Sequence, residues 1–292
     1  MVSFYISPTI PGTPIHYYGV VYALGFLLMY WVLKKNASRL GLNKDQCSNL
    51  VFFGGIGLIV GARIVHFLFS DPLIFFTQPL EVLAIHRGGM AFLGGVIGLF
   101  LGAWWYAKRI GASVLRVGDI LVLPGLIVLA FGRIANFINQ ELVGTITTKA
   151  QTPWCVNFVE SVQPLVFEQA CRHPYQLYAS VSHFFLALII LILIFKTSWL
   201  NKPGMRVGVF IFGYSVLRFI TDFFREESIR WLGLSSWQFM SIIGFGVGLW
   251  LLWYFLRKVT ESDNSLTNNN FNNKSSKQKK LSKRQKKRKK RV

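Results

Sequence analysis

Charged residues are scarce in this chain. They make up 15% of its 292 residues, whereas hydrophobic residues make up 52% and the mean hydropathy is +0.43. Soluble proteins carry about 25% charged residues. Several apolar runs reach the ~20 residues that a membrane-spanning helix needs, and they do not alternate with polar residues as barrel strands do. The composition therefore predicts an all-α polytopic membrane protein and argues against a soluble enzyme.

Cysteine is also scarce, with three in the whole chain. The sequence has no CxxC pair and no Cys/His spacing typical of a metal site, so it indicates no cysteine metal site and no catalytic cysteine. Cys155 and Cys171 share one long polar loop. They would form a disulfide if that loop faced an oxidising compartment, which the sequence leaves open.

Basic residues are absent before the first apolar segment, and Lys34 and Lys35 follow it. This is the reverse of a cleavable signal peptide, so we interpret the segment as a spanning helix. Together with the later apolar runs, it gives seven predicted spans: 17–33, 49–69, 89–107, 117–138, 179–196, 207–225 and 236–256.

Lysine and arginine alternate between the connections. They dominate after the first, third, fifth and seventh predicted spans, and are few or balanced by acidic residues in the other connections. By the positive-inside rule this predicts the N-terminus outside and the C-terminus in the cytoplasm, as an odd number of spans requires.

The C-terminal segment differs from the rest. Residues 274–292 carry twelve Lys or Arg and no acid, which is more than half of the net charge of +20. We predict a membrane domain at 1–258 and a disordered polybasic cytoplasmic tail at 259–292. Such a tail suits anionic lipid headgroups, and we predict no binding to nucleic acid.

A cluster of polar residues ends the fourth predicted span, in 131–144, FGRIANFINQELVG. Arg133 and Asn136 share a helix face, and if the helix continues, Gln140 and Glu141 lie on the same stripe. An arginine at the edge of hydrocarbon usually faces a polar cavity, a partner or a substrate. The alternative is an Arg–Glu pair that joins two helices.

Other arginines fall near the same depth. Arg63 and Arg133 would each lie roughly 8 Å below the outer membrane boundary, from the helical rise per residue. Arg225 ends the sixth predicted span and belongs to a polar stripe with Tyr214, Arg218 and Asp222, in which Arg218 and Asp222 form an i, i+4 pair. Because the planar guanidinium binds phosphodiesters well, we predict a membrane-embedded site for an anionic lipid that opens outward.

Glycines follow two patterns. Spacings of four predict close helix packing at 57–61, 94–102 and 244–248. The paired Gly88 and Gly89, at the entrance of the third predicted span, suit a backbone that approaches a ligand closely.

Motifs along most of the chain support one resemblance. They are HYYG at 16–19, GAR at 61–63, GGMAF at 88–92, GRIANFINQE at 132–141, RHPYQLY at 172–178 and DFFR at 222–225. Their order and content resemble bacterial prolipoprotein diacylglyceryl transferases. The resemblance implies seven helices and a multi-pass protein of the bacterial cytoplasmic (inner) membrane, with an active site on the outer side.

The resemblance also implies a reaction without a cofactor. The diacylglyceryl group of phosphatidylglycerol would move to the lipobox cysteine thiol of a prolipoprotein signal peptide, with release of glycerol phosphate from a monomeric enzyme. By analogy, Arg133 and Arg225 would hold the phosphate, aided by Arg63. Asn136 and Tyr18 would orient the headgroup. Gly88, Gly89 and Gly144 would allow close approach, and Glu141 would accept a proton or orient Arg133.

One departure affects the chemistry. The family commonly has a histidine, often proposed to help activate the thiol, where this chain has Leu93. His66, His86 and Glu141 are replacement candidates for the base, and the sequence does not choose among them. Two other functions therefore stay open: a lipid transporter or flippase, and an inactive relative that still binds lipid.

Overall fold

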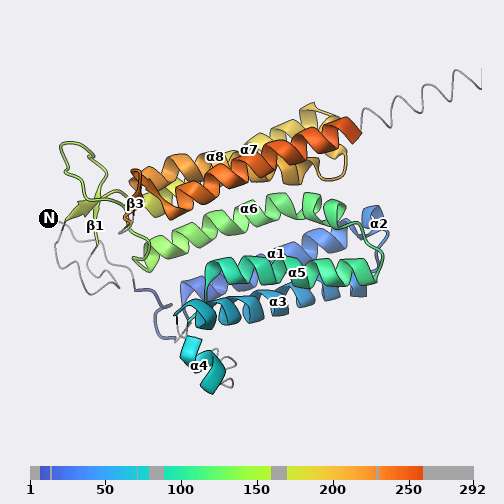
Figure 1. The fold of residues 1–292 in the computed structure, drawn as a ribbon, viewed down its shortest axis with the longest axis horizontal. Helices are drawn as coiled ribbons and strands as arrows, with labels where there is room; N and C mark the ends of the chain where they lie inside the picture. The colour runs from blue at the N-terminus through green and yellow to red at the C-terminus, as the bar shows by residue number, and fades with distance from the viewer. Residues whose placement is uncertain are drawn as a thin grey trace, which may run out of the picture.

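A computed structural model describes residues 7–13, 15–70, 72–78, 89–158, 170–227 and 230–258. Helices dominate this part of the chain, and most of the long ones lie roughly along the longer axis of Figure 1, whereas the short α4 projects away from the bundle. Six described helices are long and apolar enough to cross a membrane: α1 (Tyr17–Lys35), α3 (Lys44–Ser70), α6 (Val114–Ile138), α7 (Tyr175–Lys196), a segment at Met205–Phe224 and the C-terminal helix Ser236–Lys258. The predicted helical, polytopic architecture is therefore confirmed at this level.

The remaining elements modify the predicted boundaries. The segment Met205–Phe224 consists of α8 (Met205–Thr221) and the 3-10 turn η4 (Asp222–Phe224), so Arg225 follows the helix rather than ending it. At the third predicted span lies α5 (Phe92–Arg109), an 18-residue helix that is not among the six. Short helices make up the connections: α2 (Ala37–Leu40), α4 (Pro72–Thr77) and η3 (Trp199–Asn201). The predicted tail at 259–292 lies outside the described residues.

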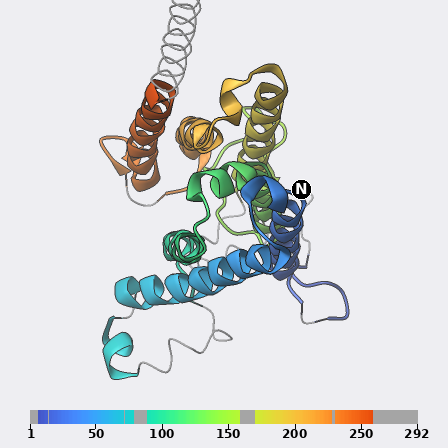
Figure 2. The same cartoon turned by 90° about the vertical axis from the view of Figure 1, so that its right-hand side faces the viewer.

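α6 occupies the centre of the bundle. In Figure 1 it separates α1, α3 and α5 from α7, α8 and the C-terminal helix, and the view along the bundle in Figure 2 agrees. It packs extensively against both α1 and α7. Residues near the end of α6 can therefore meet residues from both halves of the molecule.

α3 and α5 pack through glycine. A Cβ atom on Gly57 would lie 2.1 Å from the carbonyl oxygen of Gly98, and one on Gly61 would lie 2.3 Å from that of Gly94. Real Cβ atoms do not approach backbone this closely, so these helices touch backbone to backbone. The prediction that the glycine spacings form packing faces is confirmed for this pair.

A buried carboxylate ties α6 to the start of α8. Asp119 accepts hydrogen bonds from the backbone N–H groups of Gly204, at 2.6 Å, and Val207, at 3.0 Å. The first N–H groups of a helix have no partner within the helix, and a negative charge there is favourable. Asp119 thus caps α8 from another helix.

Many large apolar side chains on the helix exteriors are exposed, including Phe195 at 81% and Val181 at 67%. A soluble monomer rarely exposes so much contiguous apolar surface, whereas hydrocarbon would cover it. This exposure is consistent with the membrane assignment.

The loop that follows α6 forms a small structure at one end of the bundle. Its strands β1 (Val156–Asn157) and β2 (Cys171–Arg172) pair antiparallel, and a disulfide joins Cys155 to Cys171 with the Cα atoms 5.4 Å apart. A second hairpin, β3 (Arg230–Trp231) with β4 (Leu234–Ser235), lies near the same end (Figure 1). The disulfide that the sequence left open is formed.

Candidate active site

The end of α6 reverses direction instead of continuing. The helix ends at Ile138, and Gln140 and Leu142 both adopt positive φ, at 55° and 56°. The N–H of Gln140 bonds to the carbonyl of Phe137, which tightens the last turn before the reversal. The stripe that Gln140 and Glu141 would share with Arg133 if the helix continued therefore does not form, because the left-handed residue at 140 ends the helix.

The reversal nevertheless joins the predicted residues. Asn136 donates to Glu141 through its Nδ2, at 2.6 Å from Oε1, and accepts from Nη1 of Arg133 at 3.3 Å. Glu141 also lies 3.5 Å from Nδ2 of Asn139. The three predicted residues thus form a chain in which an amide connects guanidinium and carboxylate. Within the described residues Arg133 forms no ion pair, so the expected alternative of an Arg133–Glu141 lock does not occur.

Gln176 fixes the reversed segment to α7. Its Nε2 donates to the backbone carbonyl of Glu141 at 2.7 Å, and its side chain is fully buried. Its Oε1 has no hydrogen-bond partner among the described residues. A buried amide oxygen without a partner is costly, so a polar group that binds here would be stabilised.

The C-terminal part of α8 and the residues that follow it supply two more arginines, Arg218 and Arg225. Arg218 pairs with Asp222 at 3.2 Å, as predicted, and Asp222 lies 3.9 Å from Arg225. Asp222 is fully buried and accepts a hydrogen bond from the Ser235 hydroxyl. Both guanidinium groups lie over the ring of Trp237, at 5.5 and 5.8 Å from its centroid. These contacts hold two cations close together.

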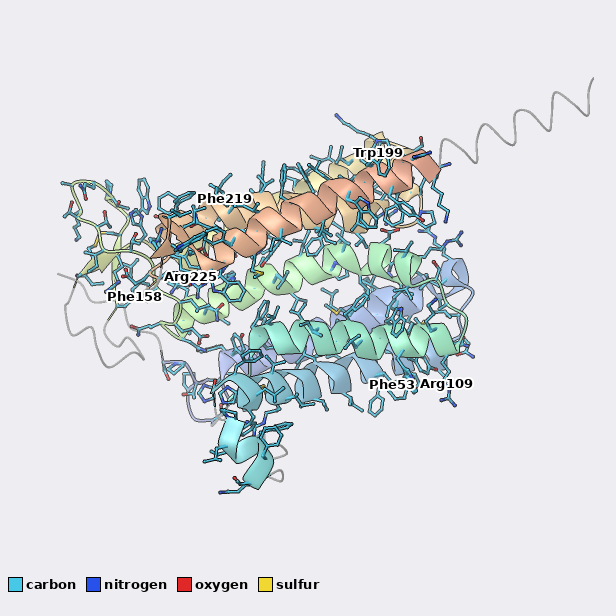
Figure 3. All side chains as sticks on the ribbon, viewed as in Figure 1. Phe53, Arg109, Phe158, Trp199, Phe219 and Arg225 are labelled. Atoms are coloured by element: carbon cyan, nitrogen blue, oxygen red, sulfur yellow. A yellow bond between two sulfur atoms is a disulfide. The ribbon has the colours of Figure 1, made fainter. Side chains whose placement is uncertain are left out.

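Arg225 has more acidic partners than Arg218. Besides Asp222, it pairs with Glu227 at 2.9 Å, and its Nε has no hydrogen-bond partner in the described chain. Burial, followed by the charge of Arg218, lowers the pKa of the Arg225 guanidinium. Figure 3 places Arg225 at the same end of the bundle as Phe158, whose ring contacts Phe137 of α6.

Tyr175 marks the point where the arginines converge. Its hydroxyl accepts a hydrogen bond from Arg218, and its side chain is fully buried. The charges of Arg218, Arg133 and Arg225 all act on this hydroxyl. Arg218 therefore belongs to the cluster, although the sequence suggested only a structural pair with Asp222. The i, i+4 spacing was visible, but nothing in the sequence showed that α6 and α7 pack beside it.

Gly144 lies where the surrounding backbone leaves no room for a side chain. A Cβ atom there would lie 2.2 Å from the carbonyl oxygen of His173 and 2.7 Å from that of Phe224. The residue pairs with Arg225 as an antiparallel bridge, and its carbonyl accepts from Arg172 at 3.1 Å. Arg172 also pairs with Glu226 at 3.2 Å. Gly144 is thus the crossing point of three segments, and its approach to a substrate stays a prediction.

Tyr18 adjoins the cluster from α1. Its hydroxyl lies 2.8 Å from that of Tyr22, and the charges of Arg133 and Glu141 act on Tyr22. The two tyrosines therefore extend the cluster towards the first helix.

Arg63 is held at the entrance of α5. It is 3% exposed, donates from Nη1 to the carbonyl of Gly89 at 3.0 Å and stacks on Phe67. Gly89 has a φ of +76°, and a Cβ atom on it would lie 2.5 Å from Nε2 of His66. The shared depth of Arg63 and Arg133 stays a prediction. Gly88 and His86 lie outside the described residues.

Fold and cluster together define a class: a polytopic helical membrane protein with three arginines, an amide and carboxylates gathered at one end of its bundle. The family model for prolipoprotein diacylglyceryl transferase matches residues 6–254. The chain belongs to this family, which confirms the resemblance predicted from the motifs.

Relatives of known name agree. The chain is 35% identical over 250 residues to a phosphatidylglycerol–prolipoprotein diacylglyceryl transferase of Legionella pneumophila (strain Paris), with 82% of this chain and 92% of the relative covered. It is 37% identical over 265 residues to the protein of that name from Pseudoalteromonas atlantica, with 85% and 88% covered. For Zymomonas mobilis the identity is 36% over 251 residues, with 82% of each chain covered.

Proposed function

We propose that this chain transfers the diacylglyceryl group of phosphatidylglycerol to the lipobox cysteine thiol of a prolipoprotein. A thioether forms and glycerol phosphate leaves. The names of the relatives give the substrates. The observation that carries the proposal for this chain is the convergence of Arg133, Arg218 and Arg225 on the buried Tyr175.

The arginines suit the change in charge during the reaction. The bound phosphodiester carries one negative charge, and the phosphate monoester that leaves carries more. Cations fixed beside this phosphate hold the leaving group more tightly than the bound lipid, and only such differential binding accelerates the step. Arg133, which forms no ion pair in the described chain, has the most hydrogen-bonding capacity left for the phosphate. Arg218 and Arg225 keep carboxylate partners and add their charge.

The amide and carboxylate position the arginine and the headgroup. The amide oxygen of Asn136 accepts a hydrogen bond from Arg133, and its amide nitrogen donates one to Glu141. A carboxylate that accepts from an amide has lone pairs left for a glycerol hydroxyl. In this role Glu141 and Tyr18 orient the headgroup, and Gly144 and Gln176 keep the segment around Glu141 in place.

We further propose that α5 is the seventh span, which puts the N-terminus outside and the C-terminus in the cytoplasm. The alternation of basic connections supports this orientation. The Cys155–Cys171 disulfide supports it too, because disulfides persist in oxidising compartments such as the periplasm. The site then faces the outer side of the cytoplasmic membrane of a monomeric enzyme, and the polybasic tail contacts inner lipid headgroups.

The test is an assay of the purified full chain in phosphatidylglycerol vesicles with a lipobox peptide. Mass spectrometry should find the diacylglyceryl group on the peptide cysteine. Arg133→Ala should lower the rate about 100-fold or more, as loss of one preorganised donor does. The matched control is Arg116→Ala, an exposed arginine near the opposite end of the same helix, which should retain wild-type activity.

Three outcomes would contradict the proposal. Phosphatidylglycerol binding without any product from the wild-type chain would indicate an inactive, lipid-binding relative. Equal rates for wild type and Arg133→Ala would remove Arg133 from the phosphate site. Lipid movement across vesicles without peptide modification would instead favour a flippase.

A further inference from the structure

His183 lies buried in the bundle, and one of its ring nitrogens has no partner among the described residues. It is 4% exposed, and its ring stacks on that of Tyr214 with the centroids 5.3 Å apart and the planes 11° from parallel. Its Nδ1 has no hydrogen-bond partner among the described residues. Native proteins rarely bury a polar atom unpaired, so such a group requires an explanation.

The surroundings of His183 belong to the site already described. The charges of Arg133 on α6 and Arg218 on α8 act on its imidazole, and Tyr214 of α8 covers its face. The hydroxyl of Ser180, one turn away on α7, is already used by the carbonyl of Ala130 at 2.9 Å. Because Tyr214 lies one turn before Arg218 on α8, the stack places the imidazole near the cluster of arginines.

His183 lies about one helical turn deeper in the bundle than Arg218. Tyr214 precedes Arg218 by one turn of α8, so the stack lies about 6 Å further into the bundle than the Cα atom of Arg218. A phospholipid with its phosphate at the arginines places its polar headgroup towards the end of the bundle. Its glyceryl carbon and acyl chains then extend inward. His183 thus lies on the side of the phosphate where the thiol must attack.

We propose that His183 is the general base that activates the lipobox thiol, an inference that rests on the proposed transfer reaction. An imidazole nitrogen takes the S–H proton, and the sulfur electron pair forms the bond to the glyceryl carbon. The bond from that carbon to the phosphate oxygen breaks, and its electron pair leaves with glycerol phosphate. The imidazolium then returns its proton to the departing phosphate monoester or to water.

The bound lipid also makes this step electrostatically consistent. An imidazolium beside Arg133 and Arg218 alone would be repelled by two cations. A phosphodiester held by the same arginines offsets their charge, so this repulsion is removed once the lipid is in place.

The experiment compares the wild-type chain with His183→Gln in phosphatidylglycerol vesicles with a lipobox peptide. Glutamine can form hydrogen bonds but cannot accept the proton. We expect kcat to fall about 100- to 10,000-fold, the usual contribution of a general base, with the KM for the lipid unchanged. The control His16→Gln changes an exposed histidine at the start of α1 whose side chain forms no cap and should keep full activity.

Two further readouts separate a base from a structural residue. The residual rate of His183→Gln should rise with pH towards the thiol pKa of about 8.5, because the thiolate then forms unaided. Free imidazole should restore part of the activity of His183→Ala.

Each result decides between the proposals. An active wild type with His183→Gln within threefold of it would overturn the base role and leave the transferase function intact. A loss that neither pH nor imidazole relieves would overturn it as well. A wild type without product would contradict the transferase function itself.

Discussion

At the scale of single residues, the side chain of Asn136 is the one that must donate one hydrogen bond and accept another at the same time. It donates to Glu141 at 2.6 Å and accepts from Arg133 at 3.3 Å. Asn136→Asp would keep the acceptor but place a second carboxylate against Glu141. Loss of a hydrogen bond to a charged group costs about 1.5–3 kcal/mol, so we expect a rate roughly 10- to 100-fold lower in the peptide assay.

The control for this prediction is Asn139→Ala, which removes the nearby amide three positions on without adding a charge. Asn139 lies 3.5 Å from Glu141, too far for a strong bond, so we expect a rate within a few-fold of wild type. If the two variants lost the same activity, the amide of Asn136 would have no special role in connecting arginine and carboxylate.

The limits of the sequence are also clearest at single residues. Arg133 and Asn136 were predictable as neighbours because a helical spacing of three places them on one face. The contact between Glu141 and Asn136 was not predictable. It depends on positive φ at Gln140 and Leu142, and these residue types do not favour this conformation. Arg218 looked like a local pair with Asp222, and its contact with Tyr175 required knowledge of helix packing.

At the scale of elements, the contact between α3 and α5 depends on the absence of side chains. A Cβ atom on Gly98 would lie 1.9 Å from the carbonyl oxygen of Gly57. Gly98→Val should therefore separate the helices and cost several kcal/mol, since neither backbone can yield. Thermal unfolding of the detergent-purified protein, followed by circular dichroism, should show a clearly lower midpoint.

Gly125→Ala is the matched control for this prediction. A Cβ atom on Gly125 of α6 would meet nothing within 4 Å, so alanine should leave the midpoint unchanged or raise it slightly. Equal midpoints for Gly98→Val and wild type would mean that the two backbones do not touch in the membrane.

The sequence predicted most elements but not their partners. Apolar run length located the six long helices to within a few residues, because hydrocarbon thickness sets that length. The glycine spacings predicted packing faces on three helices, yet a spacing does not say which face meets which. The cap that Asp119 provides for α8 joins residues more than eighty positions apart, and no local signal announces such a contact.

At the scale of the whole molecule, α6 decides where the site forms. It lies between two groups of helices, so its end can meet α1 through Tyr18 and Tyr22 and meet α7 and α8 through Tyr175 (Figure 1). The charge of the connections predicted an orientation in the membrane. It could not predict this central position, because charge in loops constrains the side of the membrane and leaves the lateral order of helices free.

The orientation of the whole molecule is testable through its cysteines. Cys155 and Cys171 form a disulfide in the loop near the site, and Cys47 is buried. In intact spheroplasts, a membrane-impermeant maleimide should label the protein only after a mild reductant is added. Cys155→Ser should be labelled without reductant, through the freed Cys171. It should also lose about 3 kcal/mol of loop stability, because the bond closes a loop with a sequence separation of 16.

The same variant connects orientation to activity. Cys171 precedes Arg172, whose guanidinium holds the carbonyl of Gly144 and pairs with Glu226, so a loosened loop should weaken the site from outside the membrane. We expect Cys155→Ser to lose several-fold in rate, and Cys47→Ser, as the control, to remain unlabelled. Labelling of Cys155→Ser only after the spheroplasts are permeabilised would place the loop in the cytoplasm. The active site would then face the wrong side for a secreted substrate, and the proposed orientation of every helix would be reversed.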